Sequence, residues 1–187
     1  MKKAIIVHGC ADEEGLSSEL RTYDKHWMPW LKRELIARGW KVETPSMPNP
    51  WKPDYDAYKK MFEELLVTED TVLIGHSCGG AFLVRWLGDS KKKVGTLVLV
   101  APWKIPDEGD STQRAFYEYP IDPSIKDRVK EIIIFTSDDE EEEGKQSAQI
   151  FHDALGGRVV SLDGHGHYTL SDMGTEEFPE LLEVLLK

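Results

Sequence analysis

The sequence predicts an α/β fold, a three-layer sandwich in which a mostly parallel sheet of about six strands is covered by helices on both faces. Short apolar runs alternate along the chain with segments whose apolar residues recur at helical spacing. The runs are nearly continuous in Val, Ile and Leu, as is typical of parallel strands buried on both faces. Neither an internal repeat nor a linker divides the 187 residues, so we expect one domain over 1–187.

The first half of the chain gives three strands and three helices. Residues 4–7 form a short apolar run, and a polar loop containing glycine follows to about Tyr23. A helical stripe is closed by Gly39, and Asp54 is a candidate N-cap for the next helix. The strands are expected at 4–7, 40–44 and 70–74, and the helices at 26–38, 54–66 and 79–87.

The second half continues the alternation. Residues 94–100 are a clear buried strand, and 101–128 is a long loop in which we expect only short helical pieces. The remaining strands are expected at 131–135 and 158–162, and the remaining helices at 144–155 and 176–186. In such sheets ligands bind at the carboxyl ends of the strands. The loops that follow the apolar runs are therefore the places to look for chemistry.

Charge and composition exclude several classes of protein. The formal net charge is −11, which argues against binding to nucleic acid or to anionic membrane surfaces. No apolar run approaches the ~20 residues that span a bilayer. The apolar run after Met1 stops at His8, which indicates a first strand and not a signal peptide. Two cysteines suggest a reducing compartment without a disulfide framework, so we expect a cytoplasmic protein.

The most informative motif is Gly75-His-Ser-Cys-Gly79, which reads G-x-S-x-G. A short apolar run precedes it and a helical stripe follows it, and this is the setting of a nucleophile elbow. The sharp turn exposes the hydroxyl of Ser77. Flanking glycines are needed because side chains there would collide with the neighbouring strand and helix.

Two other loops provide the partners of an activated serine. Aspartates 138 and 139 follow one apolar run, and histidines 165 and 167 follow the last one. The chain order Ser…Asp…His is that of α/β-hydrolases. We favour His167 over His165 because an aromatic residue follows it. Only one of the two carboxylates should face the histidine, and we favour Asp139 over Asp138.

The chemistry explains why these residue types belong together. A histidine within hydrogen-bond reach takes the serine proton during attack and later returns it to the leaving group. The carboxylate fixes the tautomer of the ring and stabilises the imidazolium. Backbone N–H donors must hold the oxyanion, and the backbone N–H groups of Cys78 and Cys10 are the candidates.

Several residues have competing interpretations. His8, Trp103 and Phe116 are candidates for lining the substrate site. For His8 we favour a role in shaping the oxyanion loop, and for Trp103 and Phe116 the alternative is packing across the edge of the sheet. For the two cysteine side chains we favour small residues that fill tight space over a disulfide or a metal site. The acidic run 138–143 is more typical of a solvated loop than of a cation site. We therefore expect no metal and no cofactor.

A resemblance to a known family is carried by residues 5–9, 27–35, 47–50, 73–79, 97–100, 137–139 and 166–167. On these residues the chain resembles the small serine hydrolases related to retinoblastoma-binding protein nine and the bacterial YdeN-like hydrolases. The resemblance implies a compact α/β-hydrolase without a large lid, with Ser77 as nucleophile, His167 as base and Asp139 as acid. In that family a proline usually follows the acid, whereas this sequence has Glu140.

The sequence thus predicts a serine hydrolase, and most specifically a carboxylesterase acting on small uncharged esters through an acyl-enzyme. The alternative is a binding or regulatory protein on the same fold with a degenerate site. Glu140 after the paired aspartates is the one feature that favours this alternative. A small-molecule ester is the expected partner, and the oligomeric state is left open.

Overall fold

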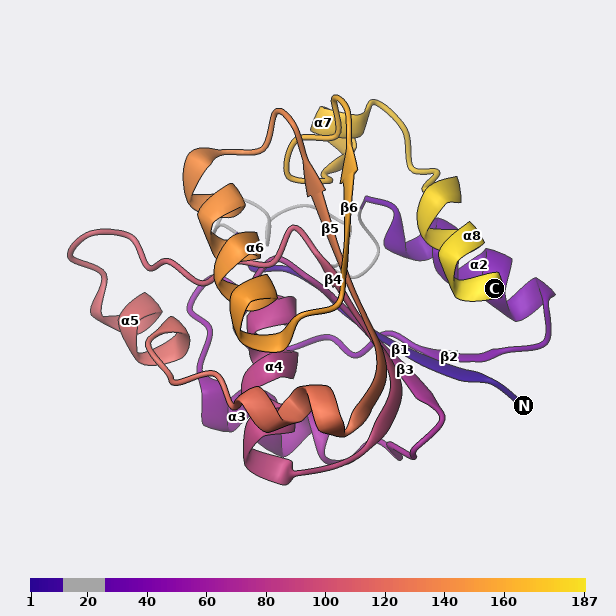
Figure 1. The fold of residues 1–187 in the computed structure, drawn as a ribbon, viewed down its shortest axis with the longest axis horizontal. Coiled ribbons are helices and arrows are strands. Elements are labelled where there is room, and N and C mark those ends of the chain that lie inside the picture. Colours follow the sequence, from indigo (N-terminus) through magenta and orange to yellow (C-terminus); the bar gives the residue numbers. More distant parts are fainter. Residues whose placement is uncertain (12–25) are drawn as a thin grey trace.

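The computed structural model describes residues 1–11 and 26–187, and its centre is a six-stranded sheet in the order β2-β1-β3-β4-β5-β6 (Figure 1). Every neighbouring pair is parallel. The strands are β1 (Lys3–Val7), β2 (Lys41–Glu43), β3 (Thr71–His76), β4 (Val94–Val100), β5 (Val129–Ser137) and β6 (Arg158–Leu162). The predicted fold class is confirmed.

Helices cover both faces of the sheet, as Figure 1 shows. On one side lie α3 (Tyr55–Phe62), α4 (Cys78–Ser90) and α6 (Glu142–Leu155), and on the other lie α2 (Met28–Ala37) and α8 (Pro179–Leu186). Alternate residues of the strands point to the two layers. Ile5, Leu73 and Leu97 belong to the core under α3, α4 and α6, whereas their neighbours Ile6 and Val98 belong to the core under α2 and α8. Because successive side chains point to opposite faces and both faces are covered by helices, both sets of residues are apolar and the strands read as continuous apolar runs.

The helices agree with the expected ones to within a few residues. The side chain of Asp54 caps α3 by accepting a hydrogen bond from the Ala57 backbone N–H at 2.8 Å, as predicted. The helices are α2 (Met28–Ala37), α3 (Tyr55–Phe62), α4 (Cys78–Ser90), α5 (Ser111–Tyr117), the 3-10 helix η2 (Pro123–Asp127), α6 (Glu142–Leu155), α7 (Leu170–Met173) and α8 (Pro179–Leu186).

One difference from the sequence prediction concerns local structure. The single turn α7 was not expected, because its only marker is a capping box in which Thr169 and Asp172 bond to each other's backbone. Most of the polar loop expected up to Tyr23 falls outside the described residues. Within 1–11 and 26–187, no helix combines the length and apolar character needed to cross a membrane.

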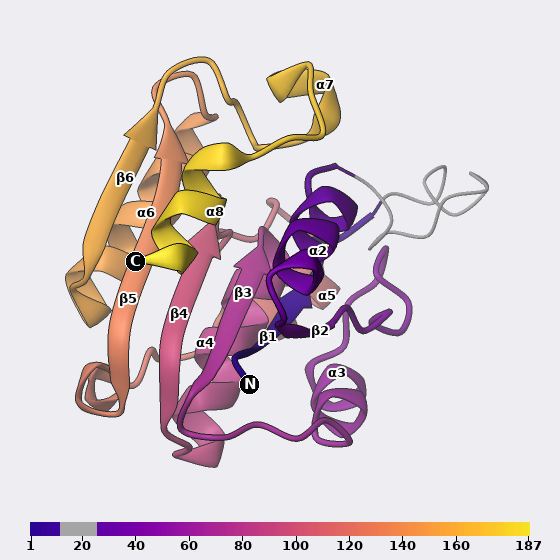
Figure 2. The same ribbon diagram turned by 90° about the vertical axis from the view of Figure 1, so that its right-hand side faces the viewer.

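The register brings the strand ends to one edge of the sheet. His76 at the end of β3 pairs with Val100 at the end of β4, and Ser137 at the end of β5 pairs with Leu162 at the end of β6. In Figure 2 the strand arrowheads point to the same end of the molecule, where α7 also lies. The loops that carry the serine, the carboxylates and the histidines therefore meet at this edge.

Candidate active site

Ser77 occupies the sharp turn between β3 and α4. Its φ of 52° and ψ of −122° are strained for a residue with a side chain, as a nucleophile elbow requires. The Ser77 backbone N–H donates to the Val100 carbonyl at 3.0 Å, and its carbonyl accepts from the Trp103 N–H at 3.2 Å. These bonds to β4 and to the loop after it hold the strained backbone in place.

The glycines around Ser77 are required by close approach of backbone to backbone. A Cβ on Gly75 would lie 2.6 Å from the Gly80 Cα, and one on Gly79 would lie 2.5 Å from the Val7 carbonyl oxygen. Real Cβ atoms essentially never come this close to other heavy atoms. The collision with strand and helix expected from the sequence is thus present in the structure.

Ser77 and His167 line the same clefts. A cavity of about 300 Å³ has both residues in its wall, together with Trp103 and Tyr117. A smaller cavity of about 70 Å³ also has both residues in its wall. Ser77 and His167 therefore border the same space, where the hydroxyl and the ring can face a common substrate.

Glu140, and not Asp139, is the carboxylate in contact with His167. The two Glu140 carboxylate oxygens lie 3.0 and 3.2 Å from His167 Nδ1, which corrects the assignment made from the sequence. The Glu140 side chain is only 1% exposed, and that of His167 is 25% exposed. A carboxylate at Nδ1 makes this nitrogen the N–H donor, which leaves Nε2 as the basic nitrogen.

The two aspartates instead join the acid loop to the histidine loop through the backbone. Asp139 accepts hydrogen bonds from the Ser137 hydroxyl and from the Gly166 N–H, the latter at 2.8 Å, and Asp138 accepts from the Gly164 N–H at 2.8 Å. The Ser137 hydroxyl, followed by the Gly166 amide, holds the pKa of the Asp139 carboxyl below its usual range. The Asp139 carboxylate thus links the two loops through hydrogen bonds and does not contact the His167 ring.

The reach of Glu140 depends on Gly144, in the first turn of α6. A Cβ at Gly144 would lie 2.7 Å from the Glu140 Cδ, so the missing side chain leaves the space that the carboxylate occupies. The spacing of Glu140 and Gly144 is the only sequence signal for this arrangement, and it is a weak one. It is difficult to recognise within a run of acidic residues.

The structure separates the two candidate histidines. The His165 ring packs against Tyr168 and Phe178, with centroid distances of 5.4 and 6.3 Å, and its Nδ1 lies 2.8 Å from the Asp163 carbonyl oxygen. His167 is the histidine that lies beside Ser77, and its backbone N–H donates to the Asp172 carboxylate at 3.0 Å.

His76 connects the elbow to the histidine loop. Its Nε2–H donates to the His167 carbonyl oxygen at 2.8 Å, which is a structural role. The ring is buried, and burial holds the pKa of His76 well below its usual value, with the neighbouring His167 charge acting in the same direction. His76 therefore stays neutral, which this single donated hydrogen bond permits.

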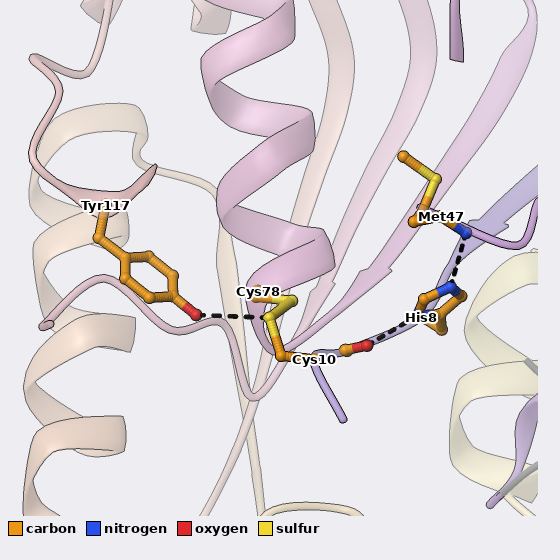
Figure 3. The surroundings of a disulfide bond; sticks show 6 residues. His8, Cys10, Met47, Cys78 and Tyr117 are labelled. Atoms are coloured by element: carbon orange, nitrogen blue, oxygen red, sulfur yellow. Dashed lines mark hydrogen bonds between the residues drawn. A yellow bond between two sulfur atoms is a disulfide. The ribbon is translucent and has the colours of Figure 1, made fainter. Parts of the chain in front are cut away.

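His8 is hydrogen-bonded to the peptide between Gly9 and Cys10 (Figure 3). Its Nε2 accepts from the Met47 N–H at 2.9 Å, so Nδ1 carries the proton and donates to the Gly9 carbonyl oxygen at 2.7 Å. In a trans peptide the Cys10 N–H points away from that oxygen. Burial lowers the pKa of His8, while its bond to Gly9 opposes that shift.

Cys10 and Cys78 form a disulfide, with Cα atoms 5.7 Å apart (Figure 3). The expectation of two unpaired small residues is wrong, because the end of β1 and the first residue of α4 approach closely enough to be bridged. The cysteine count therefore no longer argues for a reducing compartment. Within the described part of the chain, neither the Cys10 nor the Cys78 N–H donates a hydrogen bond, so both are available to an oxyanion.

Of the three residues expected to line the substrate site, only Trp103 lies in the wall of the cavity at Ser77. Its ring lies edge-on to His167, with centroids 5.4 Å apart, and its Nε1–H donates to the Ile105 carbonyl. His8 is fully buried, and Phe116 is 2% exposed and packs in the core. Tyr117, the next residue after Phe116, lines the cleft instead, because the two side chains of α5 leave the helix in different directions.

The rest of the cleft is polar and continues into a second cavity. Asp107, Gln113 and Glu141 complete the wall of the cavity at Ser77. Gln113 and Tyr117 also line a neighbouring cavity of about 750 Å³, which reaches Trp51. Among residues 1–11 and 26–187, no three or more His, Cys, Asp or Glu side chains form a group that could hold a metal ion.

Comparison with known proteins places the chain in a family. Residues 5–187 match the serine hydrolase family. The putative hydrolase YdeN of Bacillus subtilis is 29% identical over 98% of this chain and 94% of its own length, and the serine hydrolase RBBP9 of Rattus norvegicus is 27% identical over 98% and 93%.

Solved structures show the same fold. The YdeN crystal structure from B. subtilis superposes with a TM-score of 0.85 at 22% identity, covering 100% of this chain and 97% of that one. Est1E from Butyrivibrio proteoclasticus superposes with a TM-score of 0.65 at 17% identity, covering 100% and 89%. The strained serine, the histidine beside it and the match over residues 5–187 lead to one conclusion: this chain belongs to the serine hydrolase family.

Proposed function

We propose that the protein is a carboxylesterase that cleaves small uncharged esters through a covalent acyl-enzyme, with Ser77, His167 and Glu140 as its catalytic triad. The observation that carries the proposal is the contact of the buried Glu140 carboxylate with His167 Nδ1, at 3.0 Å, in a histidine that shares its cleft with Ser77. An acid, a base and a nucleophile are thereby arranged in series.

The reaction begins with attack of Ser77 Oγ on the ester carbonyl. His167 Nε2 takes the hydroxyl proton and gives it to the leaving alcohol, and Glu140 stabilises the imidazolium formed in between. Water then attacks the acyl-enzyme with the same histidine as base, which releases the acid and restores Ser77. Each step needs only these three side chains and water.

The oxyanion of both tetrahedral intermediates is held by two backbone amides. Cys78 directly follows Ser77 at the start of α4, and the Cys10 peptide is oriented by the bond from His8 to the Gly9 carbonyl. Removal of one such donor typically costs ~3 kcal/mol of transition-state stabilisation. The cysteine side chains take no part in this step.

The charges of the cleft support uncharged over anionic substrates. Asp107 and Glu141 line the cavity at Ser77, and the whole chain carries a formal charge of −11. An anionic acyl or alcohol group would meet these carboxylates at short range. The cavity of about 300 Å³ holds a small group, and Trp103 and Tyr117 offer it apolar surface.

The test is hydrolysis of p-nitrophenyl esters from acetate to decanoate, together with a succinate half-ester as the anionic probe. We expect the highest kcat/KM for short neutral acyl chains and a much lower value for the anionic ester. Ser77→Ala should lower kcat by at least about 10⁴-fold because the nucleophile is lost. Equal rates for Ser77→Ala and the wild type would refute the proposal, provided that both proteins show the same thermal unfolding.

The alternative of a binding protein with a degenerate site loses its main argument. Glu140 was the feature of the sequence that favoured it, and in the proposed mechanism its contact with His167 makes this residue the acid of the triad. A carboxylate of glutamate serves as well as one of aspartate in a hydrolase triad. The contact therefore supports the enzyme.

A further inference from the structure

The disulfide joins the two segments that carry the proposed oxyanion donors. Cys10 and Cys78 are 68 residues apart in sequence, one just beyond β1 and the other at the first position of α4. The same two residues supply the backbone N–H groups that face the reacting carbonyl in the proposed reaction. A covalent bond between their side chains therefore restricts the distance between the two donors.

The two ends of this bridge differ in how firmly the rest of the molecule holds them. Cys78 is fully buried and lies among the apolar residues under α4. Cys10 is exposed and lies beyond the last paired residue of β1, Val7. The Cys78 amide is thus fixed by the helix, whereas the Cys10 amide depends on local contacts.

Few other contacts hold the Cys10 segment. His8 bonds to the Gly9 carbonyl at 2.7 Å, and the Ala11 N–H donates to the Pro50 carbonyl at 3.2 Å. The Tyr117 hydroxyl lies 3.9 Å from the Cys10 sulfur, a weak contact at most (Figure 3). The disulfide is the one covalent link between this segment and the elbow among the described residues.

We propose that the Cys10–Cys78 disulfide positions the oxyanion hole, so that the oxidised protein is the fully active hydrolase and a dithiol lowers its turnover. This inference rests on the proposed ester hydrolysis at Ser77. It goes beyond that function by assigning the two sulfur atoms a positioning role and by making the rate depend on the redox state.

The redox step is ordinary thiol–disulfide exchange. The thiolate of a dithiol attacks the Cys10 sulfur, which belongs to the exposed residue and lines two cavities, and Cys78 leaves as a thiolate that takes up a proton. The second thiol of the reagent then displaces Cys10, so the dithiol is oxidised to a cyclic disulfide and both cysteines become thiols. Glutathione disulfide reverses the reaction and is itself reduced to two thiols.

Reduction should affect the transition state more than the binding of the ester. The oxyanion exists only after attack, so a displaced Cys10 N–H weakens an interaction that the ground state lacks. We expect kcat to fall by about tenfold or more, with KM changed less than twofold. General loosening of the cleft would instead raise KM as well.

The experiment compares four protein samples in p-nitrophenyl acetate hydrolysis: oxidised wild type, wild type reduced by dithiothreitol, and Cys10→Ala with and without dithiothreitol. Alkylation and intact mass give the thiol count of each sample. Cys10→Ala retains the backbone N–H and removes only the bridge, so it is the matched control. Its kcat should equal that of the reduced wild type and should not respond to dithiothreitol.

When glutathione disulfide is added to the reduced wild type, its kcat should return to that of the oxidised protein, which would support the positioning role of the disulfide. A second variant, Cys78→Ala, guards against misfolding of the first, and it should show the same kcat and the same insensitivity. If fully reduced wild type hydrolyses the ester within twofold of the oxidised rate, or faster, the positioning role is refuted while ester hydrolysis stands. If neither redox state hydrolyses any ester, the proposed function itself fails, and this inference with it.

Discussion

The nucleophile elbow and the acidic turn after β5 are both strand-end loops of the same sheet, yet they are specified in different ways. At the elbow, backbone atoms pack directly against each other. Gly75 and Gly79 have no room for a Cβ, and these two glycines mark the position of Ser77 between them. At the acidic turn, three consecutive carboxylates have room, and hydrogen bonds decide their roles: Asp138 and Asp139 bind loop amides and Glu140 binds His167.

A sequence motif therefore identifies a functional residue reliably where the backbone is sterically constrained. Steric constraints on the backbone leave a pattern of glycines in the sequence, and the pattern can be recognised without a structure. The choice among neighbouring carboxylates depends on side-chain length and on the space left by a residue four positions later, Gly144. Adjacent acidic residues therefore predict that a carboxylate is present and not which one it is.

The largest effect should come from separating the roles within the acidic turn. Glu140→Gln removes the charge opposite His167 Nδ1 and offers an amide that favours the wrong ring tautomer, so kcat should fall by about 10³–10⁴-fold. Asp139→Asn is the matched change one residue earlier. The kcat of this variant should fall by less than about tenfold, because the side-chain oxygen of asparagine can still accept the hydrogen bond from the Gly166 N–H. Steady-state kinetics with one neutral ester measures both.

The steric constraint at the elbow is the next test. Gly75→Ala places a Cβ 2.6 Å from the Gly80 Cα, and the backbone of α4 must move away. We expect a loss of about 1–3 kcal/mol in the free energy of unfolding, measured by urea denaturation. Gly39→Ala is the contrasting variant, since nothing lies within 4 Å of its added Cβ and only its positive φ is strained. Equal stability of Gly75→Ala and the wild type would contradict the steric argument.

A milder change tests the space beside Glu140. Gly144→Ala would bring a Cβ within 2.7 Å of the Glu140 Cδ, so the carboxylate must shift away from its place against His167. Because Glu140 is a flexible side chain, we expect a fall in kcat of about tenfold with little loss of stability, since alanine favours the helix. Combined with Glu140→Gln, the same substitution should have almost no further effect on kcat.

The smallest effect concerns the pH dependence of stability. Burial lowers the pKa values of His76 and His8, so both are neutral in the folded protein near pH 7. The unfolded chain takes up protons below its ordinary histidine pKa of ~6.5, whereas the folded protein does not until its own lower pKa values are reached. The free energy of unfolding should therefore fall as the pH is lowered from 7 to 5, by up to about 1.4 kcal/mol per pH unit for each histidine.

Urea denaturation at several pH values measures this slope. His76→Asn should be less stable at pH 7 because the bond to the His167 carbonyl is weakened, but its stability should depend less on pH than that of the wild type. The slope is the informative quantity. Equal slopes for the two proteins would mean that His76 does not carry the proton uptake.

The sequence predicted the parallel sheet, the elbow and the histidine loop because periodicity, glycine placement and chain order carry this information directly. It did not reveal Glu140, the disulfide, or the exchange of Phe116 for Tyr117 in the cleft. Each of these depends on how two segments distant in sequence approach one another. Cys10 and Cys78 are the clearest case, since 68 residues separate two side chains that only the sheet brings together.

The most direct test of the triad is the rate at which a fluorophosphonate labels Ser77, followed by intact mass in the wild type, Ser77→Ala, Glu140→Gln and Asp139→Asn. We expect one label on the wild type, none on Ser77→Ala, labelling of Asp139→Asn at nearly the wild-type rate, and labelling of Glu140→Gln slower by about 10³-fold. Rapid labelling of Glu140→Gln together with slow labelling of Asp139→Asn would contradict the proposed triad.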